Sequence, residues 1–189
     1  MRQVSLFFGS FNPVHKGHIA LAESIFEQKI ADEFWFVLSP RNPFKQESDL
    51  WSETERAGRL KSALGGRPGL VFCDVELSLP KPSYTIQTLR CLWEKYPDIR
   101  FSILMGEDNL VNLHLWRECD TILQACDIYV YPRAGEACGQ EACGRETVTE
   151  IERRYPERIH KIKAPLLDIS STQIRGMMQR GLDVSDLLP

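Results

Sequence analysis

The sequence predicts an α/β domain built on a doubly wound parallel sheet. Strand-like and helix-like segments alternate along the chain, and the strand-like segments are apolar on both faces. Such strands are typical of a parallel sheet with helices packed on each side. The chain has 189 residues, of which 43% are hydrophobic, and this is enough to bury a sizeable core. We therefore expect one domain over residues 1–189.

The first half of the chain alternates three strands with three helices. Continuous β-rich runs predict the strands, whereas Ile19, Ala22 and Ile25 have the spacing of an apolar helix face. Ser52 and Glu55 have the spacing of a capping box, which marks the start of the second helix. In chain order we expect a strand over 4–8, a helix over 18–29, a strand over 34–38, a helix over 52–64, a strand over 70–75 and a helix over 83–96.

The second half continues the pattern with a Gly-rich interruption. Segment 135–145 contains Glu-Ala-Cys-Gly twice and predicts a loop. Cys138 and Cys143 could instead form a metal or redox pair, but the spacing is not a common zinc pattern, so we expect no metal-ligating residues. In chain order we expect strands over 101–105 and 128–131, a helix over 147–155, a strand over 159–162 and a helix over 172–180.

Charge and composition exclude several classes of function. The formal net charge of −3 argues against nucleic-acid binding through bulk positive charge. No stretch is apolar for long enough to cross a bilayer, and the first residues lack the cleavage site of a signal peptide. We therefore expect a cytoplasmic protein with reduced cysteines and small-molecule substrates, and with no nucleic-acid or membrane partner.

The segment 9–18 carries the strongest functional signal, because it joins the first strand to the first helix. Ligands of parallel sheets bind beyond the carboxyl ends of the strands. Gly9 lets the backbone turn and approach a ligand, and the helix end behind it favours an anion. His15 and His18 can donate to phosphate oxygens. Histidines at this spacing could also ligate a metal or cap the helix, so local chemistry leaves three interpretations open.

A second phosphate-binding candidate opens the last predicted helix, where the sequence reads Ile-Ser-Ser-Thr-Gln-Ile-Arg over 169–175. Serine and threonine are natural N-caps. However, Ser171 and Thr172 with Arg175 one helical turn later would also form a phosphate clamp at a helix N-terminus.

These motifs resemble known ones. Gly-x-Phe-x-Pro-x-His-x-Gly-His resembles the signature of the nucleotidyltransferase superfamily, which has a Rossmann-like fold. The segment 169–175 is similar to the element with which adenylyltransferases of that superfamily grip ATP, and this favours ATP over CTP. Ser-Tyr-Thr at 83–85, Gly-Glu-Asp-Asn at 106–109 and Asn-Pro-Phe-Lys at 42–45 resemble the nicotinate-nucleotide adenylyltransferase family.

The resemblance implies that the AMP moiety of ATP is transferred to nicotinate mononucleotide, giving nicotinate adenine dinucleotide and pyrophosphate, with ATP as co-substrate and Mg²⁺ as cofactor. The reaction belongs to NAD biosynthesis. The implied catalytic residues are His15, His18, Lys45 and Arg175. The implied ATP-binding residues are Gly9, Ser10, Phe11, His18, Gly106, Asp108, Arg133, Ser171, Thr172 and Arg175. The implied acceptor-binding residues are Thr85, Trp116 and Lys45.

The free N–H groups at 83–85 would face the acceptor's carboxylate, and Trp116 would stack on its ring. Trp116 also lies among leucines, a pattern that fits a core residue. Asn12 and Gln87 stand where the family often has aspartate, and Phe44 stands where it often has histidine.

No side chain is indicated as a nucleophile, so we expect direct in-line attack on the α-phosphorus, assisted by alignment and charge stabilisation. Two alternatives stay open: an adenylyltransferase for nicotinamide mononucleotide or phosphopantetheine, and a non-catalytic nucleotide-binding module. The second would be expected to lack His18 or the Ser-Thr-Arg element, and this chain has both.

Overall fold

A computed structural model describes residues 1–40, 50–132, 142–165 and 169–189, and for 142–147 it describes the backbone only. Four of the residues discussed above lie outside these ranges: Phe44, Lys45, Arg133 and Cys138. Their predicted roles, and that of the Cys143 side chain, stay predictions.

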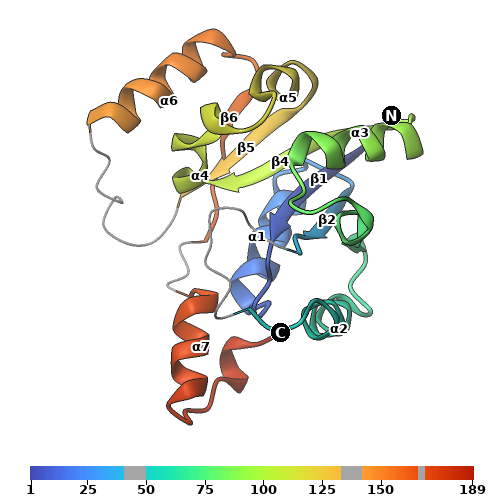
Figure 1. The fold of residues 1–189 in the computed structure, drawn as a ribbon, viewed down its shortest axis with the longest axis vertical. Helices are drawn as coiled ribbons and strands as arrows, with labels where there is room; N and C mark the ends of the chain where they lie inside the picture. Colours follow the sequence, from blue (N-terminus) through green and yellow to red (C-terminus); the bar gives the residue numbers. More distant parts are fainter. Residues whose placement is uncertain (41–49, 133–141, 166–168) are drawn as a thin grey trace.

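The described residues form a six-stranded sheet in which every neighbouring pair is parallel (Figure 1). The strand order is β3-β2-β1-β4-β5-β6, which reverses direction between β1 and β4. This confirms the predicted doubly wound sheet and places a ligand crevice outside the carboxyl ends of β1 and β4. The strands are β1 (Arg2–Gly9), β2 (Glu33–Leu38), β3 (Leu70–Cys73), β4 (Ile99–Gly106), β5 (Asp127–Tyr131) and β6 (Ile159–Lys161).

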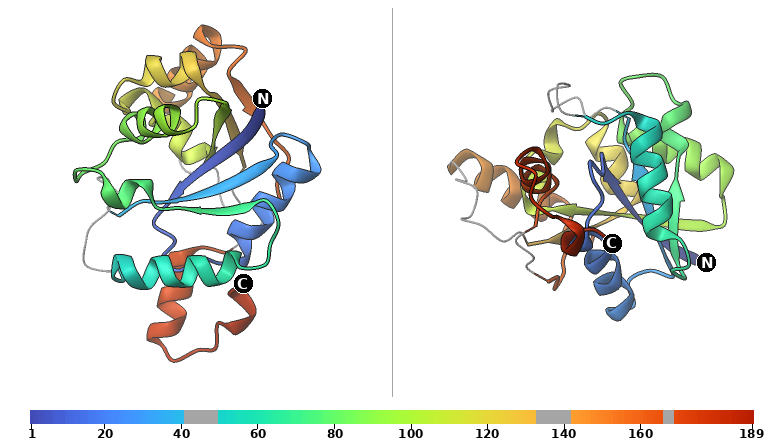
Figure 2. Two further views of the ribbon diagram at one scale, coloured as in Figure 1. Left: turned by 90° about the vertical axis from the view of Figure 1, so that its right-hand side faces the viewer. Right: turned by 90° about the horizontal axis from the view of Figure 1, so that it is seen from below.

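Helices cover both faces of the sheet (Figure 2). Alternate residues of one strand enter different cores, so that Ile103 faces one and Leu104 the other. The core around Leu104 is closed by α1 (Lys16–Glu27) and α2 (Glu53–Leu64). The core around Ile103 is closed by α3 (Thr85–Lys95), α4 (Glu107–Val111), α5 (Cys119–Ala125) and α6 (Ala142–Arg154).

The last helix, α7 (Ser171–Gln179), lies beyond the carboxyl ends of the central strands (Figure 1). Three 3₁₀ turns complete the described elements: η2 (Val75–Ser78), η3 (Leu113–Leu115) and η4 (Ser185–Leu187). In the described part of the chain, no helix is long and apolar enough to span a membrane.

The differences from the prediction concern short elements. The third strand ends at Cys73 rather than at 75, because Val75 begins a 3₁₀ turn. The sequence did not predict α4 and α5, whose five and seven residues are too few to show a helical period. The helix α6 begins at Ala142, inside the segment predicted as a loop. The predicted cap of α2 is confirmed, since the Ser52 hydroxyl accepts the Glu55 N–H at 3.1 Å.

Candidate active site

A cavity of about 820 Å³ opens at the carboxyl ends of the strands, where the strand order reverses. Most of the predicted site residues that the structure describes meet there. Those lining the cavity are Gly9, Ser10, Phe11, His15, His18, Thr85, Asp108, Trp116, Ser171 and Thr172. Two described residues do not line it: Gly106 is the buried N-cap of α4, and Arg175 lies behind the loop that follows β1.

In the Gly-Ser-Phe sequence after β1, the ring of Phe11 packs closely against Gly9. A Cβ atom on Gly9 would lie 2.9 Å from the ring of Phe11, so a larger residue would displace that ring. Phe11 is 2% exposed and has a left-handed backbone with φ of 43°, which is uncommon for a bulky residue. The Phe11 side chain therefore packs inside the loop, and its predicted contact with a phosphate would come from the backbone.

His15 and His18 lie against each other at the start of α1. Their rings stack with centroids 3.7 Å apart, and His18 Nδ1 accepts a hydrogen bond from the His15 backbone N–H at 3.1 Å. Because Nδ1 is the acceptor, Nε2 carries the proton in the neutral imidazole of His18. Phe11 packs edge-on against His18 at 5.2 Å and helps to fix its orientation. His18 is thus part of the N-terminal cap of α1, and its ring also lines the cavity.

The start of α7 is tied to the loop after β1. The Ser171 hydroxyl donates to the carbonyl of Pro13 at 2.9 Å, and Arg175 Nη1 donates to the carbonyl of Asn12 at 2.7 Å. Arg175 Nη2 also donates to the Thr172 hydroxyl at 3.4 Å. The N-cap is Ser170, whose hydroxyl accepts the Gln173 N–H, so capping does not account for Ser171 or Thr172. The two predicted phosphate elements form one wall of the cavity.

Arg56 is a buried residue that supports the loop after β1 through hydrogen bonds, although the sequence analysis did not identify it. It is 1% exposed, and its guanidinium donates to the carbonyls of Ser10, Ser39, Pro40 and Trp51 at 2.8–3.1 Å. Burial lowers the pKa of Arg56, partly offset by Glu53. The loops after β1 and β2 are therefore fixed to α2 by one buried cation.

The cavity wall near the start of α3 has a buried carboxyl that the sequence analysis also missed. Glu76 lines the cavity and is 3% exposed. It accepts hydrogen bonds from the hydroxyls of Thr88 at 2.8 Å and Ser83 at 3.2 Å, and Ser39 is a third partner. Burial raises the pKa of Glu76, and these three hydroxyls oppose the shift. Glu76 thus links the end of β2 to the start of α3.

The expectation of free N–H groups at the start of α3 needs a correction. Tyr84 is the N-cap, and its N–H donates to Gln87 Oε1 at 3.1 Å, so this group is already bonded. Gln87 therefore caps its own helix in place of the aspartate often found there. Trp116 is half-buried: it packs against the core around Ile103, as its leucine neighbours suggested, and it also lines the cavity, while its stacking on an acceptor ring stays a prediction.

The described cysteines offer no nucleophile to this cavity. Cys73, Cys91, Cys119 and Cys126 are free thiols, and none of these four lines it. Burial raises the pKa of Cys73 to about 11 and that of Cys126 to about 12, so both thiols stay protonated at neutral pH.

Replacing Glu76 by glutamine tests the buried carboxyl. A raised pKa means that the folded state binds the proton more tightly than the unfolded chain does. The wild-type protein therefore loses stability as pH rises above the ordinary value of 4.5, until the carboxyl is ionised in both states. Glutamine does not titrate, so Glu76→Gln does not undergo this loss. The free energy of unfolding of Glu76→Gln should therefore rise relative to that of the wild type as pH increases over the same range.

Urea unfolding at a series of pH values between about 4 and 8 measures this difference. Thr88→Val removes one hydroxyl that opposes the shift, so it should extend the pH range over which stability is lost. A Glu76→Gln difference that stays constant with pH, or that declines as pH rises, would contradict the assignment.

Comparison with known proteins assigns the chain to a family. The family model described as cytidylyltransferase-like matches residues 6–177. A protein of Flavobacterium johnsoniae described as a probable nicotinate-nucleotide adenylyltransferase is 39% identical over 187 residues, covering 99% of this chain and 92% of its own. A protein of Bacteroides fragilis with the same description is 37% identical, with 96% and 85% covered.

Solved structures support the fold. Nicotinic acid mononucleotide adenylyltransferase of Plasmodium falciparum, solved with NaAD, superimposes with a TM-score of 0.76 at 18% identity and covers 98% of this chain and 88% of its own. The sequence relatives, which match over nearly the whole chain, support a family assignment, whereas the solved structure at this low identity supports the fold alone. By the family-model match and by identity over nearly its whole length, the chain belongs to the nicotinate-nucleotide adenylyltransferase family of cytidylyltransferase-like proteins.

Proposed function

We propose that this chain joins the AMP moiety of ATP to nicotinate mononucleotide, producing nicotinate adenine dinucleotide and pyrophosphate. The observation that carries the proposal is a cavity of about 820 Å³, whose lining includes both the predicted phosphate elements and Thr85 and Trp116. One space therefore has room and matching chemistry for both substrates. Relatives described by the same activity cover the chain almost completely.

In this mechanism a phosphate oxygen of the acceptor attacks the α-phosphorus of ATP. The bond between the α-phosphorus and the bridging oxygen breaks, and pyrophosphate leaves. His18 donates from Nε2 to the α-phosphate and stabilises the charge that develops there. The Thr172 hydroxyl, which accepts from Arg175 and still has a proton to donate, and the start of α1 hold the phosphate chain. The Ser171 hydroxyl would join them by turning from the Pro13 carbonyl to the phosphate. Lys45 and Arg133 are proposed as further cations.

Magnesium fits this site as part of the Mg–ATP complex. Among the described residues, the carboxylates that line the cavity are Glu76 and Asp108, and Glu76 is already bonded to hydroxyls. Asp108 is the less buried of the two and would be the protein group to meet the ion, and phosphate oxygens would supply most of its ligands. The ion would neutralise phosphate charge during transfer.

Pyrophosphate release from Mg–ATP tests the proposal with three acceptors in turn. Nicotinate mononucleotide should give the highest kcat/KM, nicotinamide mononucleotide a lower value, and phosphopantetheine no turnover. Pyrophosphate release with phosphopantetheine alone, or with none of the three, would overturn the proposed function.

A further inference from the structure

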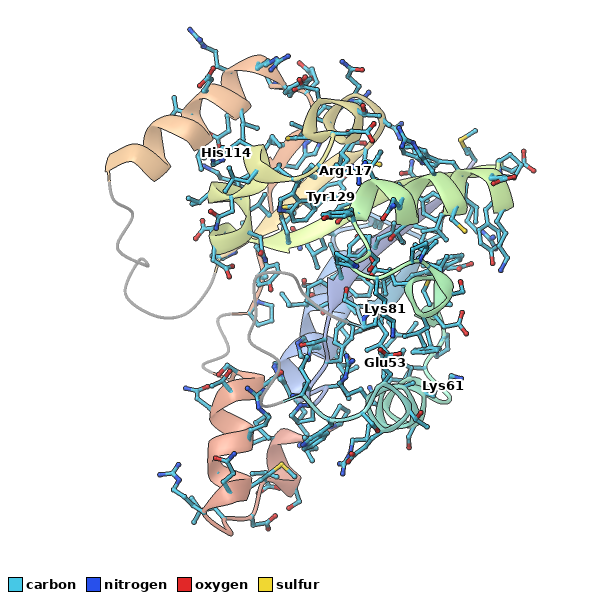
Figure 3. The ribbon with its side chains drawn as sticks, viewed as in Figure 1. Glu53, Lys61, Lys81, His114, Arg117 and Tyr129 are labelled. Carbon is cyan, nitrogen blue, oxygen red and sulfur yellow. The ribbon has the colours of Figure 1, made fainter. Side chains whose placement is uncertain are left out.

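Arg117 is a cation on the acceptor side of the cavity that the motifs of the sequence do not include. It lies between η3 and α5, and it lines the cavity with Trp116 and Thr85. Its guanidinium lies over the ring of Tyr84, 5.3 Å from the ring centroid. Because Tyr84 is the N-cap of α3, this contact places the positive charge beside the first turn of that helix (Figure 3).

The neighbouring carboxylate, Glu118, is paired with another cation, Arg90. Glu118 has a left-handed backbone with φ of 55°, and its two carboxylate oxygens accept hydrogen bonds from Arg90 at 3.1 and 2.6 Å. Within the described residues, no carboxylate forms an ion pair with Arg117. The guanidinium is exposed and is therefore available to bind an anionic group in the cavity.

Two of the groups near Arg117 do not favour a negative acceptor. The Tyr84 N–H is bonded to Gln87, and the carboxyl of Glu76 lines the same cavity. An anionic ring substituent at this end would therefore need a positive partner. A guanidinium presents a planar fork of N–H donors that matches a carboxylate.

We propose that Arg117 determines acceptor specificity by pairing its guanidinium with the carboxylate on the pyridine ring of the acceptor. The inference rests on the proposed function and deepens it. The amide analogue lacks the negative charge, so it gains little from Arg117. A charge-assisted hydrogen bond at an exposed site should contribute about tenfold in kcat/KM. Since the pair is exposed, salt should weaken it.

The experiment compares the two acceptors at saturating Mg–ATP. The variants are Arg117→Gln, which removes the charge, and Arg117→Lys, which keeps it without the fork. The control is Lys95→Gln, which removes a cation at the end of α3 that also lies over a tyrosine ring but is outside the cavity. For each protein, kcat/KM for nicotinate and nicotinamide mononucleotide is measured at about 0.05 and 0.5 M salt, concentrations between which screening changes strongly.

Arg117→Gln should lower kcat/KM for the nicotinate form about tenfold and change that for the amide form less than about threefold. Arg117→Lys keeps the charge but loses the fork, so its preference should lie between those of the wild type and Arg117→Gln. The ratio of kcat/KM for the two acceptors should fall with salt in the wild type and in Lys95→Gln, and it should not fall in Arg117→Gln. Equal losses for both acceptors, or an unchanged preference, would overturn the role of Arg117. A wild type that uses neither acceptor would instead refute the proposed function, and the inference with it.

Discussion

Replacing His18 by alanine should lower kcat by about 100-fold or more, because one preorganised donor to a phosphoryl transition state contributes roughly that much. The geometry that supports this expectation is the hydrogen bond from the His15 N–H to His18 Nδ1, which assigns the proton of the neutral ring to Nε2. Steady-state turnover with saturating Mg–ATP and acceptor measures the effect.

A second substitution separates the catalytic donor from the helix cap. Gln87 and Gln173 each accept the N–H of their own N-cap residue, at the position that His18 has in α1. His18→Gln should therefore preserve the cap and the melting temperature while kcat stays at least about 100-fold low, whereas His18→Ala should also lose about 1 kcal/mol of stability. Near-normal turnover of a folded His18→Gln variant would exclude the donor role.

Replacing Arg56 by leucine should have the largest effect on stability. Four carbonyl oxygens, on the loops after β1 and β2 and just before α2, would lose a buried donor. A buried acceptor left unsatisfied costs about 1–3 kcal/mol, so we expect a loss of about 3 kcal/mol or more in the free energy of unfolding. Chemical denaturation measures this loss.

Arg59 is the matched control for Arg56, because it lies one turn away on the same helix but is exposed and paired with Glu55. Arg59→Leu should cost less than about 1 kcal/mol. If Arg56→Leu were as stable as Arg59→Leu, the four carbonyls would have other partners, and Arg56 would not be the anchor of these loops.

The phosphate side of the site could be predicted from the sequence because its determinants are local. The turn, the two histidines and the start of α1 lie within ten consecutive residues, and the start of α7 is equally compact. The alternation of apolar segments was enough for the sheet and for the longer helices. The short helices α4 and α5 were missed because they have too few turns to show a period.

The supporting residues could not be predicted from local patterns, because their partners are distant in the sequence. Arg56 bonds Ser10 across 46 positions, and Glu76 bonds Thr88 across 12. A weak signal was present, since Arg56 lies four residues before Leu60 on the buried face of α2. A charged residue at a core position indicates a buried partner but does not say which one.

The fate of the α-phosphate tests the central claim most directly. The protein is incubated with ATP labelled at the α-phosphorus, Mg²⁺ and nicotinate mononucleotide, and the products are separated. Direct adenylyl transfer predicts that the label enters nicotinate adenine dinucleotide and that one pyrophosphate is released for each dinucleotide formed. Label recovered as free AMP or as ADP, with none in the dinucleotide, would contradict it.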